Sequence, residues 1–135
     1  MKKGPLLLLI LIGVLCSCKY YDKEYYERIS GINFPSDCKH IDTFDNGEFL
    51  TISVFEVDSL ELANFCKGNH LVPCSESLFL RLYGGAQLRE PPPAKCYQGI
   101  YYVDGERGKN SWIYVADIKR NLLWARIEYP DWGGK

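Results

Sequence analysis

Histidine is scarce in this chain of 135 residues, and no block of basic residues occurs in it. The motifs G-x-S-x-G, H-E-x-x-H, the P-loop and G-x-G-x-x-G are also absent, so these types of enzyme are not indicated. Without Lys2 and Lys3, 14 basic residues face 17 acidic ones, a net charge near −3 (14 − 17). Because binding to nucleic acid depends on neutralising phosphates, we expect no nucleic-acid partner. We expect a protein that is not an enzyme.

The chain also lacks an apolar run long enough to cross a membrane. Its apolar stretch, residues 6–15, has about ten residues, whereas a membrane-spanning helix needs about 20. Lys2 and Lys3 precede this stretch, and a positive segment followed by a short apolar one is typical of a secretory signal. We therefore predict export from the cytoplasm.

The end of the apolar stretch reads Leu15-Cys16-Ser17-Cys18. These residues resemble the lipobox of bacterial lipoproteins, in which a branched apolar residue stands three positions, and a small residue one position, before a lipid-modified cysteine. Cys16 fits less well, because Leu15 would precede it directly. The resemblance implies a signal peptide over residues 1–17 and a lipid on Cys18. An ordinary secretory signal cleaved nearby is the alternative.

The lipoprotein resemblance also implies a location. Lipid on Cys18 would hold the protein on a membrane of the cell envelope. Lys19 is not the acidic residue that retains lipoproteins in the inner membrane of enterobacteria, so the outer membrane of a Gram-negative bacterium is favoured.

Four cysteines follow the proposed lipid site: Cys38, Cys66, Cys74 and Cys96. An even number of cysteines in an exported chain predicts disulfide bonds, and four cysteines allow three connectivities. We favour Cys66–Cys74, which closes a short loop, together with Cys38–Cys96. This arrangement leaves no free thiol.

His40 and His70 lie near three of these cysteines, which raises zinc as an alternative. The spacings Cys38-x-His40 and Cys66-x3-His70-x3-Cys74 lack the usual paired C-x2–4-C arrangement. A cysteine nucleophile with a histidine base would need an unpaired, activated thiol. We expect no metal, no cofactor and no catalytic residue.

Residues 18–30 are charged and rich in tyrosine, and we interpret them as the lipid anchor and a tether. A short helix is the alternative, because Tyr21, Tyr25 and Ile29 recur at helical spacing. Gly31 and Pro35 end this segment, and residues 31–135 are predicted to form a single domain.

The rest of the chain alternates between two periodicities. Period-two patterns predict strands, Asp58 and Glu61 resemble the capping residues of a helix that ends at Gly68, and Asn46-Gly47 predicts a hairpin turn. The predicted elements are strands at 38–44, 49–57, 97–103, 112–117 and 122–129, helices at 58–68 and 75–83, and a proline-rich loop at 87–95. Residues 75–83 also fit a strand. We expect an α+β fold: one antiparallel sheet of about five strands with two short helices on one face.

Such a fold leaves the second sheet face uncovered. We propose Trp112, Tyr114, Trp124 and Arg126 as partner-binding residues on that face, because aromatic and arginine side chains dominate many interfaces. The alternative places Trp112 and Trp124 in the core. The pattern of elements resembles small lipoproteins of unknown function from gut-type bacteria and some toxin-immunity proteins. This implies a non-catalytic binding or inhibitory module with a protein partner. A glycan-contacting or hydrolytic accessory lipoprotein and a structural envelope lipoprotein remain alternatives.

Overall fold

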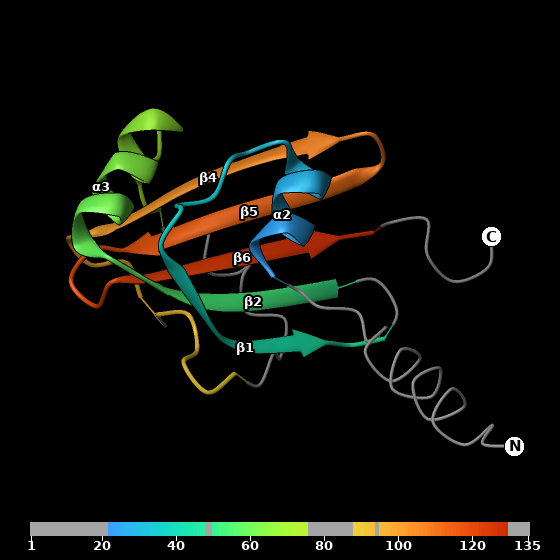
Figure 1. Ribbon diagram of the computed structural model, residues 1–135, viewed down its shortest axis with the longest axis horizontal. Helices are drawn as coiled ribbons and strands as arrows, with labels where there is room; N and C mark the ends of the chain where they lie inside the picture. Colours follow the sequence, from blue (N-terminus) through green and yellow to red (C-terminus); the bar gives the residue numbers. More distant parts are fainter. Residues whose placement is uncertain (1–21, 48–49, 76–87, 94, 130–135) are drawn as a thin grey trace, which may run out of the picture.

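The computed structural model describes residues 22–47, 50–75, 88–93 and 95–129. They form one antiparallel sheet of six strands in the order β1-β2-β6-β5-β4-β3, with helices α2 and α3 on one face (Figure 1). The elements are α2 (Lys23–Ser30), β1 (Cys38–Asp45), β2 (Leu50–Val57), α3 (Ser59–Gly68), β3 (Val72–Pro73), β4 (Ile100–Arg107), β5 (Asn110–Asp117) and β6 (Leu122–Glu128). The prediction of one antiparallel sheet with helices on one face is confirmed, with one strand more than expected.

Two hairpins, β1–β2 and β5–β6, follow the sequence pattern closely. β1 pairs with β2 from Cys38 opposite Val57 to Asp45 opposite Thr51, and a bulge at residue 41 shifts the register between His40 and Asp42. β5 and β6 pair without a shift. A turn at residues 118–121 joins them, and Asn121 adopts the positive φ that this residue type tolerates (φ 56°).

The third predicted strand begins later than expected. We predicted residues 97–103, but β4 starts at Ile100, because Tyr97 to Gly99 form a turn in which Gly99 has a φ of 105°. A positive φ of this size favours glycine and is incompatible with a regular strand. At its other end the strand is longer than predicted, because β4 continues beyond residue 103 to Arg107. The predicted helix at 75–83 lies, beyond Ser75, outside the described residues.

α3 forms where the sequence predicts a helix. The Asp58 carboxylate accepts hydrogen bonds from the backbone N–H groups of Leu60 and Glu61, which satisfies two of the open donors at the helix start. Leu62 and Phe65 are buried against the sheet. Neither this helix nor α2 is long and apolar enough to cross a membrane.

The segment that we interpreted as a tether contains α2, so the tether interpretation is wrong from residue 23 onward. Asp22 caps the helix by accepting a hydrogen bond from the N–H of Tyr25, and Gly31 ends it in the left-handed conformation (φ 79°). Tyr26 is fully buried on the sheet. The folded domain therefore begins at this helix and not at residue 31.

The sheet has a core on each face. The helix-covered face carries the larger core: Tyr26, Phe34, Phe55, Val57, Leu62, Phe65, Trp112, Tyr114, Ala116, Leu123, Ala125 and Ile127. The opposite face carries Val54, Ile100, Ile113, Val115, Leu122 and Trp124. We refer to residues 88–93 as the strap. Leu88 packs on this second core, and Pro92 and Pro93 are buried. The expectation of an uncovered sheet face is therefore wrong.

The cysteine pairing also differs from the favoured one. Cys74 is bonded to Cys96, while Cys38 and Cys66 are free thiols, each half-buried. The Cys74 N–H donates to the Ile100 carbonyl, which holds the end of β3 beside the start of β4 and brings Cys74 near Cys96. Closing a loop of 22 residues stabilises the fold by about 3 kcal/mol in the chain-entropy account.

We expect two free thiols per mature chain when the unreduced protein is unfolded and titrated, because the sulfur of Cys18 would carry lipid. Burial raises the pKa of Cys66 from 9.0 to about 11 in the folded protein. The unfolded chain therefore loses this proton at lower pH than the folded chain, and stability falls as pH rises from 9 towards 11. Alkylation followed by mass spectrometry checks the count. A count of zero thiols would mean that Cys38 and Cys66 are also in disulfide bonds.

Candidate functional site

The four residues proposed as partner-binding do not share a face. Trp112 and Tyr114 belong to the helix-covered core. Trp124 and Arg126 lie on the opposite face of the sheet, which carries the strap. All four are buried, with exposed fractions of 9% or less. The proposal that they line one uncovered surface is therefore wrong, and the alternative that Trp112 and Trp124 are core residues is confirmed.

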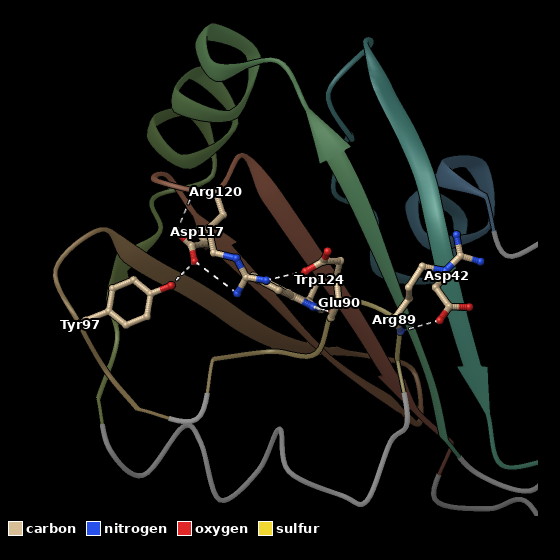
Figure 2. Close-up of polar contacts among 7 residues, drawn as sticks. All are labelled: Asp42, Arg89, Glu90, Tyr97, Asp117, Arg120 and Trp124. Atoms are coloured by element: carbon tan, nitrogen blue, oxygen red, sulfur yellow. Dashed lines mark hydrogen bonds and ion pairs between the residues drawn. The ribbon is translucent and has the colours of Figure 1, made fainter.

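A polar cluster occupies the end of the sheet where β5 turns into β6 (Figure 2). At its centre is Asp117, whose carboxylate is fully buried. Its Oδ1 accepts hydrogen bonds from the backbone N–H groups of Lys119 (3.1 Å) and Arg120 (3.2 Å), as is usual for aspartate at a turn. Its Oδ2 accepts a hydrogen bond from the Tyr97 hydroxyl. Asp117 thus fixes both the turn and an aromatic ring.

Arg120 connects this turn to the strap. Its guanidinium donates to the Glu90 carboxylate at 2.7 Å, lies 4.0 Å from Asp117 Oδ2, and stacks 5.6 Å from the ring centre of Trp124. The Trp124 Nε1–H donates to the Glu90 carbonyl (2.9 Å). Figure 2 shows Arg120 extended between the two carboxylates and alongside the indole. These contacts hold the strap on the second sheet face.

The strap residue before Glu90 is held by β1. The Arg89 N–H donates to Asp42 Oδ2 at 2.8 Å (Figure 2). The bulge before Asp42 in β1 places this carboxylate on the strap face. Asp42 and Glu90 therefore hold the first half of the strap on the sheet, and Asp117 holds the turn that carries Arg120.

A hollow of about 500 Å³ lies beside the disulfide, and we call it the disulfide hollow. It is lined by Pro73, Cys74, Cys96, Tyr97, Gln98, Gly99, Ile100 and Tyr101. Tyr97 is the large exposed side chain of this lining, with 38% of its surface accessible. Burial and the hydrogen bond to the Asp117 carboxylate raise the pKa of the Tyr97 hydroxyl, so it remains a donor at neutral pH. The ring is consequently held in one orientation.

The Lys119 side chain lies beside the Tyr97 ring. Its ammonium group lies 5.7 Å from the ring centre. A Cβ at Gly99 would stand 3.4 Å from the Lys119 Cγ, so the lysine stem passes close over this glycine. Tyr97 thus combines an exposed aromatic surface, a fixed orientation and an adjacent positive charge. These properties are typical of a contact residue in an interface.

The exposed large apolar side chains among the described residues are Leu60, Val72 and Tyr97. Val72 directly precedes Pro73, which lines the disulfide hollow, and Leu60 lies in the first turn of α3. The sequence pattern did not single out these three side chains as exposed apolar surface. The signal that could have found Tyr97 is its position next to Cys96 in a turn after the proline run, where a side chain has few neighbours to cover it.

A second hollow, of about 510 Å³, is lined mainly by polar residues of β1, β2, the start of α3 and the β5–β6 turn. Asp37, Glu56 and Asp58 line it together with Lys39 and Arg120, so it carries charges of both signs. Within residues 22–47, 50–75, 88–93 and 95–129, no group of three or more His, Cys, Asp or Glu side chains is placed to hold a metal ion.

Comparison with known protein families, with characterised proteins and with solved structures finds no match for this chain. A function must therefore be argued from its own residues.

Proposed function

We propose that this protein is a lipid-anchored envelope protein whose domain binds a protein partner, in the manner of an inhibitory or immunity-like module, and carries out no reaction of its own. The lipobox residues Leu15 to Cys18 support the anchor, and Lys19, which is not an acidic retention residue, supports the outer membrane as its location. The disulfide Cys74–Cys96 supports an oxidising compartment such as the periplasm.

The observation that carries the binding proposal is the fixed, exposed ring of Tyr97 at the disulfide hollow. An aromatic side chain that is already ordered loses little conformational freedom when a partner covers it. The disulfide and the Asp117 turn hold the two sides of the hollow. A partner would bury the Tyr97 ring at the centre of the contact.

The anchor is tested by Cys18→Ala. We expect this variant to leave the membrane fraction or to remain unprocessed, since several acyl chains at about 0.8 kcal/mol per buried CH₂ otherwise hold the protein on the membrane. Fractionation of cells and mass spectrometry of the mature N-terminus give the answer. A Cys18→Ala protein that is processed and stays on the membrane as the unmodified one does would refute the anchor.

The binding site is tested by placing a photo-crosslinking amino acid at Gln98, which is exposed in the hollow, and at Asn64, which is exposed on α3. We expect a discrete protein adduct from position 98 and none from position 64. With the captured partner purified, Tyr97→Ala should weaken binding by about 2 kcal/mol, or about 30-fold in Kd. Lys39→Ala, on the β1 edge, is the matched control and should bind normally.

Two outcomes would contradict the binding proposal. Retention of the protein on an envelope polysaccharide, abolished by Tyr97→Ala and without a protein adduct, would favour a glycan-contacting role. Turnover of an envelope substrate that responds to substitutions in the hollow would make the protein an enzyme.

A further inference from the structure

The disulfide hollow and the second hollow lie at the same end of the sheet. One row of paired residues crosses the sheet there: Cys38 with Val57, Glu56 with Leu122, Leu122 with Asp117, and Asp117 with Ile100. The second hollow lies at the β1–β2 side of this row, and the disulfide hollow lies at its β3–β4 side. The β5–β6 turn, residues 118–121, stands between the two hollows.

Asp117 holds one lining residue of each hollow. Its Oδ2 accepts a hydrogen bond from the hydroxyl of Tyr97, which lines the disulfide hollow, and lies 4.0 Å from the guanidinium of Arg120, which lines the second hollow. Figure 2 shows Tyr97 and Arg120 on either side of this carboxylate. Because Asp117 is fully buried and also fixes the turn, the two hollows keep a set position relative to each other. A partner that covers both therefore pays little to order this surface.

The disulfide hollow has positive charge beside it. Its lining residues are uncharged, but Lys119 Nζ lies 5.7 Å from the centre of the Tyr97 ring, and the exposed Lys95 directly precedes Cys96. Among the described residues, no carboxylate forms an ion pair with either lysine. Since acidic residues outnumber basic ones in the chain as a whole, this local excess suits a partner that brings a carboxylate.

The second hollow has the opposite charge. Arg120 in its lining is paired with Glu90 at 2.7 Å. The other charged lining residues are one lysine and three carboxylates, a net charge of −2 (1 − 3): Lys39, Asp37, Glu56 and Asp58. Asp37 and Glu56 are exposed, and within the described part of the chain neither forms an ion pair. Opposite charges on the two sides of one turn select the orientation of a partner.

We propose that the two hollows and the β5–β6 turn between them form one docking surface for a single protein partner whose charges run in the opposite order. The partner places an acidic side chain beside Tyr97 and Lys119, and a basic side chain beside Asp37 and Glu56. This proposal rests on the proposed function, which gives the Tyr97 site a protein partner, and adds the second half of the contact. The four spacings from β1 to β4, at about 4.8 Å each, make the surface about 19 Å wide. That width fits within the ~800 Å² that a stable interface covers on each protein.

Photo-crosslinking in the full-length, anchored protein tests whether one partner covers both hollows. The crosslinking amino acid is placed at Ser59, which is exposed in the second hollow, and the adduct is compared with that from Gln98 in the disulfide hollow. We expect the same partner at both positions, identified by mass spectrometry, and no adduct from Asn64 on α3.

Charge reversal with the purified partner tests the orientation. Glu56→Lys and Lys119→Glu should each weaken binding about tenfold, mainly through slower association, and the effect should shrink at high salt. Glu106→Lys is the matched control, because Glu106 is an exposed glutamate at the opposite end of β4, and it should bind normally. Thermal melting followed by circular dichroism confirms that each variant is folded.

Several results would overturn this proposal. An adduct from position 98 and none from position 59 would confine the contact to the disulfide hollow and leave the proposed function intact. A different protein at position 59, or a second copy of this chain, would give the second hollow another occupant. Normal binding by a folded Glu56→Lys variant, where Tyr97→Ala weakens binding, would refute the charge arrangement alone. Absence of an adduct from both positions would refute the proposed function and this proposal together.

Discussion

Trp124→Ala should cost about 3–5 kcal/mol of the free energy of unfolding, the range for truncating a large buried aromatic side chain. Trp124 is fully buried on the strap face, where its ring packs with Val54, Ile113 and other core residues. Its removal also leaves the Glu90 carbonyl without the indole donor and Arg120 without the ring it stacks on. The free energy of unfolding of a whole domain is about 5–15 kcal/mol, so this variant loses a large part of it.

Urea denaturation measures this effect. Unfolding is followed by circular dichroism and not by tryptophan fluorescence, because the substitution removes the Trp124 indole. Trp124→Phe is the control: it keeps most of the ring but loses the hydrogen bond to Glu90, and should cost less than the alanine variant. If Trp124→Ala unfolds at the same urea concentration as the natural protein, the placement of this side chain under the strap is wrong.

Tyr26→Ala should have an effect of similar size, about 3–5 kcal/mol, and should also release α2 from the sheet. The ring contacts Phe34 and Phe55 at centroid distances of 5.9 Å, and the hydroxyl donates to the buried Ser53. Tyr26→Phe keeps the ring and removes only this hydrogen bond, so it should cost about 0.5–1.5 kcal/mol, because Ser53 Oγ keeps its hydrogen bond with Thr43 Oγ1 (2.6 Å).

Limited proteolysis distinguishes loss of α2 from general destabilisation. We expect cleavage within residues 23–30 of the alanine variant under conditions in which the sheet remains intact, and no such cleavage in the phenylalanine variant. If both variants resist cleavage there as the natural protein does, Tyr26 is not the residue that holds α2 on the sheet.

The sheet could be predicted from the sequence because its strands carry a clear local signal. Leu50, Ile52 and Val54 alternate along β2, and Asn46-Gly47 marks the hairpin before it. α3 carries its own capping residue at Asp58. These signals depend on neighbouring residues in the sequence, and distant contacts did not override them.

α2 was harder to predict, because an eight-residue polar helix has little stability of its own. The sequence showed apolar residues at helical spacing in Tyr25 and Ile29, but the residue that fixes the helix is Tyr26. Its burial depends on Ser53 and Tyr114, which come 27 and 88 residues later in the chain. Periodicity alone does not contain that information.

The prediction of the partner-binding residues was wrong for a related reason. Alternation along β5 and β6 correctly separates the two faces of each strand, but it does not say what covers them. The strap covers the second face through contacts of Glu90 with Arg120 and Trp124, between segments about 30 residues apart. The cysteine pairing likewise depends on where β3 joins β4, which four cysteines in a sequence leave open.

The bond between Cys74 and Cys96 gives the chain a property that its strands alone would not. Residues 74–96 form a covalently closed ring. A single cut anywhere within this ring leaves β1, β2 and α3 joined through sulfur to β4, β5 and β6. Outside the cytoplasm, where disulfides persist, such a nicked protein would remain one covalent molecule until a reductant cleaved the Cys74–Cys96 bond.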